Sequence, residues 1–335
     1  MRRLGWGIIG IGNIVNGTIA PAMLAEPECE LVAGVSRDRS RADAFAARFG
    51  APGAYTDLRT MLDDPAVEAV FIATPNALHA DQVVAAARAG KHVLCDKPLA
   101  IDTDSALRAV RAAADAGVSL GVNFDTRVLP WVRDVARMIA EGHIGHPRIV
   151  EVQVASGPRR WENWRADPAM VGLGTVHNVA VHALDFLRVI LGSEPVEVTA
   201  MFDRPAGSPE VEYVALVLIR FDDGTLASVD ANEAVPHPTN TISIFGTEGR
   251  ILGSGFTRAR ADGELRVLRD TDETVTSYPA PQSHRASVAA FTSAVLSGEE
   301  PSPSGIDGLR SVELCDAIAR SVDERRTVAV ETVDP

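Results

Sequence analysis

The chain has 335 residues, of which 46% are hydrophobic and 23% are charged, and its formal net charge is −13. At roughly 100–200 residues per domain, this length predicts about two domains, and the apolar fraction excludes a disordered chain. The acidic balance disfavours nucleic acid or an anionic membrane as a partner. Three cysteines without metal-type spacing argue against a disulfide framework and a bound metal, and favour a cytoplasmic location.

The first third of the chain alternates short apolar runs with amphipathic stretches of helical length. This alternation predicts parallel strands linked by crossover helices, with both faces of the sheet covered. We expect strands at 6–9, 31–35, 69–73, 92–95 and 119–122. Helices are expected at 40–49, 58–62, 77–89 and 104–116, the last with polar N-cap candidates at 102–105 and a stop at Gly117.

The pattern changes after residue 123, where helices at 129–141 and 176–191 precede longer alternating strands at 196–202, 212–221, 225–232 and 240–245. The corner Asp222-Asp223-Gly224 predicts a hairpin, and further helices are expected at 282–297 and 306–322. We therefore predict an α/β protein. A doubly wound, Rossmann-type dinucleotide-binding domain would span residues 1–124. An α+β domain with a large, mostly antiparallel open sheet, for substrate binding and oligomerisation, would span residues 125–335.

The segment Gly10-Ile11-Gly12 follows the first expected strand. A glycine-rich turn there lets the backbone approach a pyrophosphate at the start of a helix, so Gly10, Gly12, Asn13 and Ile14 are predicted cofactor contacts. Val15 stands where the usual fingerprint has a third glycine. A tight turn without a ligand is the alternative.

Ser36 and Arg37 end the second expected strand, where an acidic residue would favour NAD by accepting from the ribose hydroxyls. A small hydroxyl followed by an arginine, with Arg41 nearby, suits a 2′-phosphate instead. These residues predict NADP, with NAD still possible. In the alternative interpretation the arginines are solvated surface.

Two polar clusters, at 73–79 and 90–98, follow later strands and lie at the sheet edge where α/β folds bind ligands. We predict that Thr74, Pro75, Asn76 and His79 contact the cofactor. With the glycine loop, they resemble the glucose-fructose oxidoreductase, inositol dehydrogenase and rhizopine-catabolism family, Gfo/Idh/MocA, over essentially the whole chain. Asp96-Lys97-Pro98 is similar to that family's Glu-Lys-Pro tripeptide. The resemblance implies a catalytic Lys97 near the nicotinamide and the substrate oxygen, with Asp96 also at the cofactor.

The segment 172–185 resembles the family's glycine-led helix start followed by Asp-x-Gly-x-His-x-x-Asp. Helical spacing predicts that Asn178, His182 and Asp185 line one face, which should point at the nicotinamide. The resemblance implies that His182 is the acid/base. Asn178 replaces the family's aspartate and Ala180 its glycine, so His182 should be a weaker base than in typical relatives.

Asn178 is counted with Lys97 and His182 in the predicted catalytic and substrate-binding set, and Asn123 is expected to face the substrate. His177, rotated away from that face, is expected to be structural.

Within the family, the chain resembles the NADP-dependent 1,5-anhydrofructose reductase and dihydrodiol dehydrogenase branch. The similarity rests on the opening Trp-Gly-Ile-Ile-Gly at 6–10, on Ser36, on the segment 141–147 and on Trp164-Arg165. It implies that Trp164 and Arg165 contact the cofactor. A buried core aromatic is the alternative for Trp164.

Three functions compete at this point. The first is hydride transfer on a sugar, a cyclitol or a related hydroxy or carbonyl compound, which the retention of Lys97 and His182 favours. The second is a cofactor-binding protein that has lost catalysis, as Asn178 would allow. The third is a hydrolase or lyase that uses transient oxidation by NAD. The resemblance also implies a homodimer or homotetramer.

Overall fold

The computed structural model describes residues 2–158, 161–204, 210–237, 239–255, 262–280 and 282–335. The chain divides into two compact units. The first comprises Met1–Asp125, His284–Val312 and Val333–Pro335, and the second comprises Thr126–Ser283 and Glu313–Thr332.

The predicted division after residue 124 lies next to the first crossover between the units, but the second predicted domain is not continuous. Residues 284–312 return to the first unit. The reason is hydrophobic: Val288 and Phe291 are buried in the core cluster of that unit, with the ring centroid of Phe291 5.6 Å from that of Trp6.

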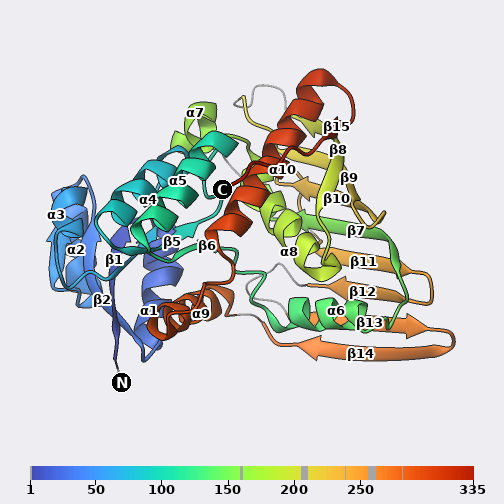
Figure 1. Ribbon diagram of the computed structural model, residues 1–335, viewed down its shortest axis with the longest axis horizontal. Coiled ribbons are helices and arrows are strands. Elements are labelled where there is room, and N and C mark those ends of the chain that lie inside the picture. The colour runs from blue at the N-terminus through green and yellow to red at the C-terminus, as the bar shows by residue number, and fades with distance from the viewer. Residues whose placement is uncertain (1, 159–160, 205–209, 238, 256–261, 281) are drawn as a thin grey trace. The chain divides into compact units, whose positions relative to one another are not determined.

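The first unit contains a six-stranded parallel sheet in the order β3-β2-β1-β4-β5-β6, which is the order of the dinucleotide-binding fold (Figure 1). The strands are β1 (Leu4–Ile9), β2 (Cys29–Val35), β3 (Gly53–Tyr55), β4 (Ala69–Ile72), β5 (His92–Asp96) and β6 (Leu120–Asn123). The predicted Rossmann-type fold is confirmed. The short edge strand β3 was not expected, because three half-buried residues carry no alternating pattern.

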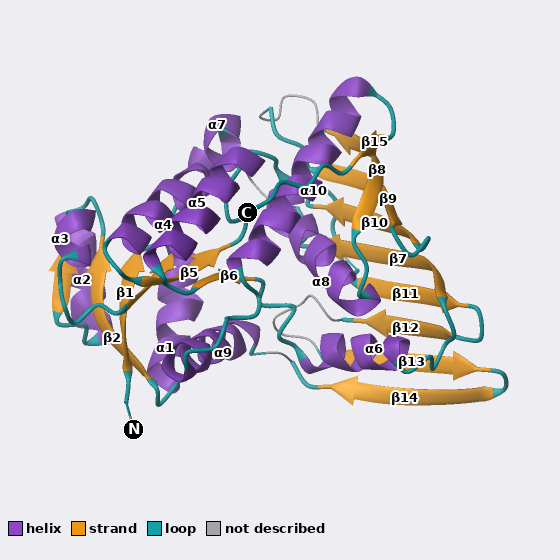
Figure 2. Cartoon of the chain, viewed as in Figure 1, coloured by secondary structure: helices purple, strands orange, loops and turns teal. Residues whose placement is uncertain are grey.

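The helices of the first unit include η1 (Val15–Ile19), α1 (Ala20–Ala25), α2 (Arg39–Phe49), α3 (Leu58–Leu62), η2 (Asn76–Leu78), α4 (His79–Arg88), α5 (Thr103–Ala116) and α9 (Ser283–Ser297). α4 and α5 lie side by side (Figure 2). The predicted ends of α5 are confirmed, because the Asp102 carboxylate accepts the N–H of Ser105 and Gly117 adopts a left-handed conformation with φ 66°.

The second unit is built on a nine-stranded sheet in the order β14-β13-β12-β11-β7-β10-β9-β8-β15, with β15 at one edge and β14 at the other (Figure 1). β10 pairs with β7 in parallel and the other pairs are antiparallel, so the predicted mostly antiparallel sheet is confirmed. Its strands are β7 (Pro147–Ala155), β8 (Pro195–Asp203), β9 (Val214–Phe221), β10 (Leu226–Asn232), β11 (Thr241–Gly246), β12 (Arg250–Ser254), β13 (Gly263–Arg269), β14 (Asp272–Tyr278) and β15 (Val328–Ala329).

The remaining helices are α6 (Pro130–Ala140), η3 (Asn163–Ala166), α7 (Pro168–Val171), η4 (Val176–Ala180), α8 (Val181–Leu191) and α10 (Gly305–Glu324). The predicted hairpin corner joins β9 to β10, and Gly224 has φ 87° there. The helical stretch Pro168–Leu191 is long and apolar enough to cross a membrane, but 67% of its apolar 18-residue window is buried within the protein. This degree of burial is typical of a core helix.

The two faces of the large sheet differ sharply along β9. Val217 and Ile219 are buried, whereas their neighbours Leu216 and Leu218 are 53% and 60% exposed. Met201 on the adjacent strand β8 pairs with Leu216 and is 72% exposed. One face of the sheet therefore packs into the core, and the other carries large apolar side chains on its surface.

Candidate functional site

The loop after β1 carries glycine at two positions, and the reason for glycine differs between them. Gly10 has φ 96°, and a Cβ there would lie 2.7 Å from the backbone oxygen of Ala73, so the fold itself requires glycine. A Cβ at Gly12 would meet nothing within 4 Å. Packing of the described residues therefore does not demand glycine at position 12, whereas close approach of a pyrophosphate does. The free space around position 12 makes the loop compatible with a bound dinucleotide.

Val15, which replaces the third glycine, is fully buried in the core cluster beside Trp6. It begins η1, a π-helical turn that precedes α1. The third glycine of the usual fingerprint permits close packing of helix against strand. Here the larger Val15 is part of the buried core instead, and the helix starts with a wider turn, a feature often found at functional sites.

The end of β2 carries the predicted contacts to the adenosine ribose. Arg37 and Arg41 are exposed and Ser36 is partly exposed. The nearby acidic residue, Asp38, is the N-cap of α2, and its carboxylate accepts the N–H groups of Ser40 and Arg41 at 2.9 and 3.3 Å. The Ser40 hydroxyl, which donates to the same carboxylate at 2.7 Å, and these N–H groups hold the pKa of Asp38 below its usual range. The carboxylate is thus engaged in capping the helix, while the two arginines face solvent.

His79 joins the two polar loops at the carboxyl edge of the sheet. Its ring is 1% exposed, with Nδ1 2.7 Å from the carbonyl oxygen of Pro98 and Nε2 3.0 Å from that of Thr74. Burial lowers the pKa of His79 and favours the neutral ring. The hydroxyl of Thr74 donates to Gln82 at 2.6 Å, and Asn76 is buried beside them. His79 thus holds the Thr74–Asn76 loop against the loop that carries Lys97.

The loop of Lys97 is fixed through Asp96, the last residue of β5. One carboxylate oxygen of Asp96 accepts the backbone N–H of Lys97 at 3.1 Å and the side-chain amide of Asn123 at 3.2 Å. Asn123 is 1% exposed, and its amide oxygen has no hydrogen-bond partner among the described residues. Sequence reasoning missed the neighbours of Asn123. His284, at the start of α9, lies 3.4 Å from its amide nitrogen and 3.5 Å from the Asp125 carboxylate.

Trp164 and Arg165 lie on the short helix η3. The Arg165 guanidinium carbon stands 4.3 Å from the centroid of the Trp164 ring, which is a cation–π contact. Trp164 itself packs against a small cluster formed by Trp161, Val171 and Val211. It is partly buried, so one ring serves both the packing and the arginine.

The helix that carries Asn178 and His182 begins at a tight contact. A Cβ at Gly174 would lie 2.2 Å from the backbone oxygen of Glu212, so the glycine is required. The buried Glu212 carboxylate accepts the N–H groups of Gly174 and Val176 at 2.7 and 2.9 Å. Burial nevertheless raises the pKa of Glu212. This carboxylate fixes the first turn of the helix, because it accepts from backbone N–H groups that have no partner within the helix.

That first turn, η4, is π-helical rather than α-helical, and α8 continues from Val181. Asn178 and His182 are partly exposed. Asp185 is 1% exposed and paired with Arg127, whose Nε donates to it at 2.9 Å. A buried guanidinium therefore engages the Asp185 carboxylate. His177 is also buried, and its Nδ1 accepts the N–H of Leu173, as a structural role requires.

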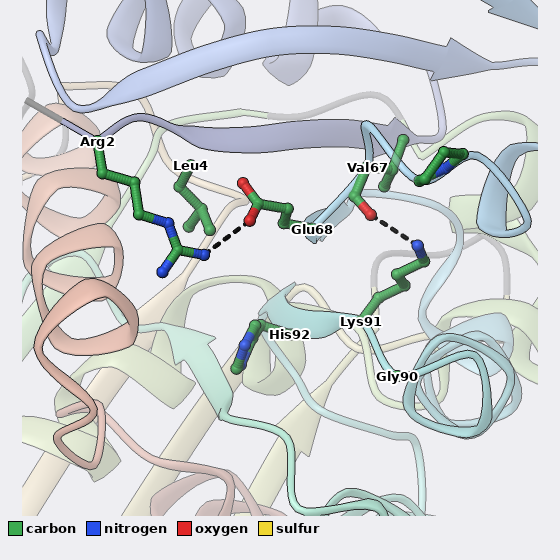
Figure 3. A pocket seen from close by; sticks show the side chains of 8 residues that line it. Arg2, Leu4, Val67, Glu68, Gly90, Lys91 and His92 are labelled. Carbon is green, nitrogen blue, oxygen red and sulfur yellow. Dashed lines mark hydrogen bonds and ion pairs between the residues drawn. The ribbon is translucent and has the colours of Figure 1, made fainter.

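One cavity of about 220 Å³ in the first unit lies away from these residues (Figure 3). It is lined near the starts of β1 and β5, at the amino edge of the sheet, by residues that include Arg2, Glu68, Lys91 and His92. Arg2 pairs with Glu68 at 2.8 Å, and Lys91 donates to the carbonyl of Val67 at 2.7 Å. Because cofactors bind at the opposite, carboxyl edge of such sheets, we do not assign this cavity to the site.

A sheet in the dinucleotide-binding order, an open glycine loop and a lysine after the fifth strand are the features expected of a nicotinamide-dependent oxidoreductase. Comparison with known proteins agrees. Residues 4–124 match the model of the oxidoreductase family with an NAD-binding Rossmann fold, and residues 132–252 match the GFO/IDH/MocA C-terminal domain.

Among known relatives, the 1,5-anhydro-D-fructose reductase of Ensifer adhaerens is 31% identical, and the match covers 98% of each chain. A levoglucosan dehydrogenase in complex with NADH and L-sorbose superposes with a TM-score of 0.90 at 27% identity, over 99% of this chain and 100% of the other. A 3-ketoreductase from Actinomadura kijaniata, in complex with TDP-benzene and NADP, gives a TM-score of 0.86 at 30% identity, over 96% and 98%.

The chain belongs to the Gfo/Idh/MocA oxidoreductase family, as its motifs predicted. It is an NAD(P)-dependent oxidoreductase, and its relatives are named dehydrogenases and reductases. Complexes with NADH and with NADP both occur among the similar structures.

Proposed function

We propose that this protein transfers a hydride between NADP(H) and a sugar, a cyclitol or a related hydroxy or carbonyl compound. The observation that supports this most directly is the strand order, because β1, β4 and β5 are neighbours. Their carboxyl ends therefore bring the Gly10–Gly12 loop, the Thr74 loop and Lys97 to one edge of one sheet.

Each side chain has a defined role in this proposal. NADP(H), when bound, supplies or accepts the hydride. The Lys97 ammonium donates a hydrogen bond to the reacting substrate oxygen and stabilises the negative charge that develops on it. His182 exchanges the proton of that oxygen, giving it up during reduction and taking it during oxidation. Asn123, through its amide oxygen, and Asn178 bind substrate hydroxyls, while Thr74, Pro75 and Asn76 line the cofactor.

The direct test mixes the protein with NADPH and a panel of ketoses, osones and dicarbonyl sugars, and with NADP⁺ and the matching alcohols. Nicotinamide absorbance reports turnover, which Lys97→Ala and His182→Ala should each abolish. Tight cofactor binding without turnover would instead support a binding protein, to which the change of the family aspartate to Asn178 points. Substrate consumption without net redox change, with the cofactor retained through purification, would support a hydrolase or lyase.

For the cofactor we propose a preference for NADP. The exposed Arg37 and Arg41 can bind a 2′-phosphate, and the carboxylate of Asp38 is engaged in capping α2. Ser36→Asp should lower kcat/KM for NADPH and raise it for NADH, because an added carboxylate repels the phosphate and accepts from the free ribose hydroxyls. We expect the NADPH to NADH ratio of kcat/KM to fall at least about tenfold, which corresponds to the loss of one charge-assisted contact.

Arg48→Ala is the matched control for that experiment. Arg48 lies in the last turn of the same helix, where its guanidinium stacks on Phe49 at 4.8 Å from the ring centroid. It should leave the cofactor ratio unchanged. If Ser36→Asp also leaves the ratio unchanged, the proposed NADP site is wrong.

We further propose that the protein is a cytoplasmic homo-oligomer. Its three cysteines are free and buried, which suits a reducing compartment. The exposed face of the large sheet carries Met201, Leu216 and Leu218 on adjacent strands, with Ile149 and Leu226 47% and 44% exposed nearby. A contiguous apolar surface of this kind favours burial against a second copy.

Sedimentation equilibrium tests the oligomer, since it measures mass directly and separates dimer from tetramer. Leu218→Glu places a charge within the apolar face and should reduce the mass toward that of one chain. Val275→Glu, on the edge strand β14, provides a matched exposed substitution and should leave the mass unchanged. A wild-type protein that sediments as one chain would rule out this proposal.

A further inference from the structure

Glu233 is a buried carboxylate that the sequence did not single out. It follows the last residue of β10 and is 0% exposed. Its backbone N–H donates to the carbonyl oxygen of Tyr213 at 2.8 Å, which fixes the chain at this point. A buried carboxylate needs hydrogen-bond donors, so its partners indicate its purpose.

Two side chains donate to the same oxygen of Glu233. The Nδ2 of Asn178 and the Oγ of Ser156 each lie 2.7 Å from its Oε1. A carboxylate can only accept, and therefore the amide nitrogen of Asn178, not its oxygen, must face Glu233. The contact fixes the orientation of the amide and joins the negative charge of Glu233 to the turn that leads into His182.

The other carboxylates around this helix have different partners. Asp185 pairs with Arg127, and Glu212 accepts the N–H groups of Gly174 and Val176. Asp230 lies on β10, three residues before Glu233, and its carboxylate accepts from the side-chain amides of Gln153 and Asn232. Tyr213, whose pKa is raised chiefly by burial and also by the charge of Glu233, is the neighbouring phenol. Glu233 is the carboxylate that accepts the side-chain amide of Asn178.

We propose that Glu233 is a positioning residue for His182, and that it supplies through Asn178 the negative charge that an aspartate at position 178 would carry. This inference rests on the proposed acid/base function of His182. Asn178 and Glu233 together then provide the contact and the negative charge that a single aspartate provides in the family pattern. The departure at Asn178 relocates the carboxylate and keeps its effect on His182, which explains how catalysis can persist without the aspartate.

The experiment measures the pKa of His182 by NMR in histidine-labelled protein, assigned with His182→Gln. Glu233→Gln keeps an oxygen that can accept from Asn178 and Ser156 but removes the charge. We expect the pKa of His182 to fall by about one unit, because an anion nearby favours the imidazolium. Asn178→Asp combined with Glu233→Gln returns the charge to position 178 with the hydrogen bond reversed, and should restore the wild-type pKa.

Asp230→Asn is the matched control, since it makes the same carboxylate-to-amide change three residues earlier. Melting temperature and NADPH affinity establish that each variant is folded. The proposal is overturned if Glu233→Gln, while folded, leaves the pKa of His182 unchanged, or if Asp230→Asn lowers it equally.

The pH dependence of carbonyl reduction gives a second readout. His182 must be protonated to donate, so the rate falls as the pH rises through its pKa. Removing the carboxylate should move that fall to lower pH by about one unit and reduce the rate on the alkaline side about tenfold. Because the NMR measurement needs no turnover, a wild-type enzyme inactive on every substrate would contradict the proposed function without deciding the role of Glu233.

Discussion

Replacing Lys97 by methionine should lower kcat/KM by about 10²–10³-fold, the usual cost of removing one donor that stabilises the charge developing on the substrate oxygen. Methionine keeps most of the length of the side chain and removes the ammonium. The loop itself should persist, because Asp96 holds the backbone N–H of residue 97 and the amide of Asn123, and His79 holds the carbonyl of Pro98. The loss should therefore appear in kcat, with NADPH affinity changed little.

Lys91→Met is the matched control in the same unit. Its ammonium donates to the backbone oxygens of Asp64 and Val67 at the opposite, amino edge of the sheet. It should cost some stability and leave kcat intact. A Lys97→Met enzyme with wild-type kcat on a substrate that the wild type reduces would refute the catalytic role of this lysine.

The sequence predicted the dinucleotide fold well because its strands are buried on both faces. All four residues of β4 are buried, so the run is continuous and apolar, and the same holds for β1. β7 carried a usable signal that was missed, since Val150, Val152 and Val154 alternate with more polar residues. β14 carried almost none. Six of its seven residues are exposed, and it is held by pairing with β13.

The parts of the site that escaped prediction depend on contacts distant in sequence. The contact of Asn178 with Glu233 spans 55 residues, and that of Asn123 with His284 spans 161. Local patterns hold no information about such partners. The π-helical turns η1 and η4 also escaped, because hydrophobic periodicity does not separate a five-residue hydrogen-bonded turn from a four-residue one over so short a length. Motifs located the residues, and tertiary packing decided their orientation.

The largest loss of stability is expected at the ion pair between Arg127 and Asp185. Both side chains are nearly inaccessible, at 9% and 1% exposed, and the guanidinium donates to both carboxylate oxygens. Removing either partner leaves the other buried charge without its counter-ion. Arg127→Met or Asp185→Asn should therefore each lower the free energy of unfolding by about 3–5 kcal/mol, measured by urea denaturation with circular dichroism.

Combining Arg127→Met with Asp185→Asn distinguishes the ion pair from simple packing. With no charge left to desolvate, the double variant should be more stable than either single one, so the two changes should be strongly non-additive. The exposed pair Arg39–Asp43 on α2 is the control, and its disruption should have no measurable effect, because solvent already screens it. If the losses at Arg127 and Asp185 simply add, the two side chains are not energetically coupled, and this account of the buried ion pair is wrong.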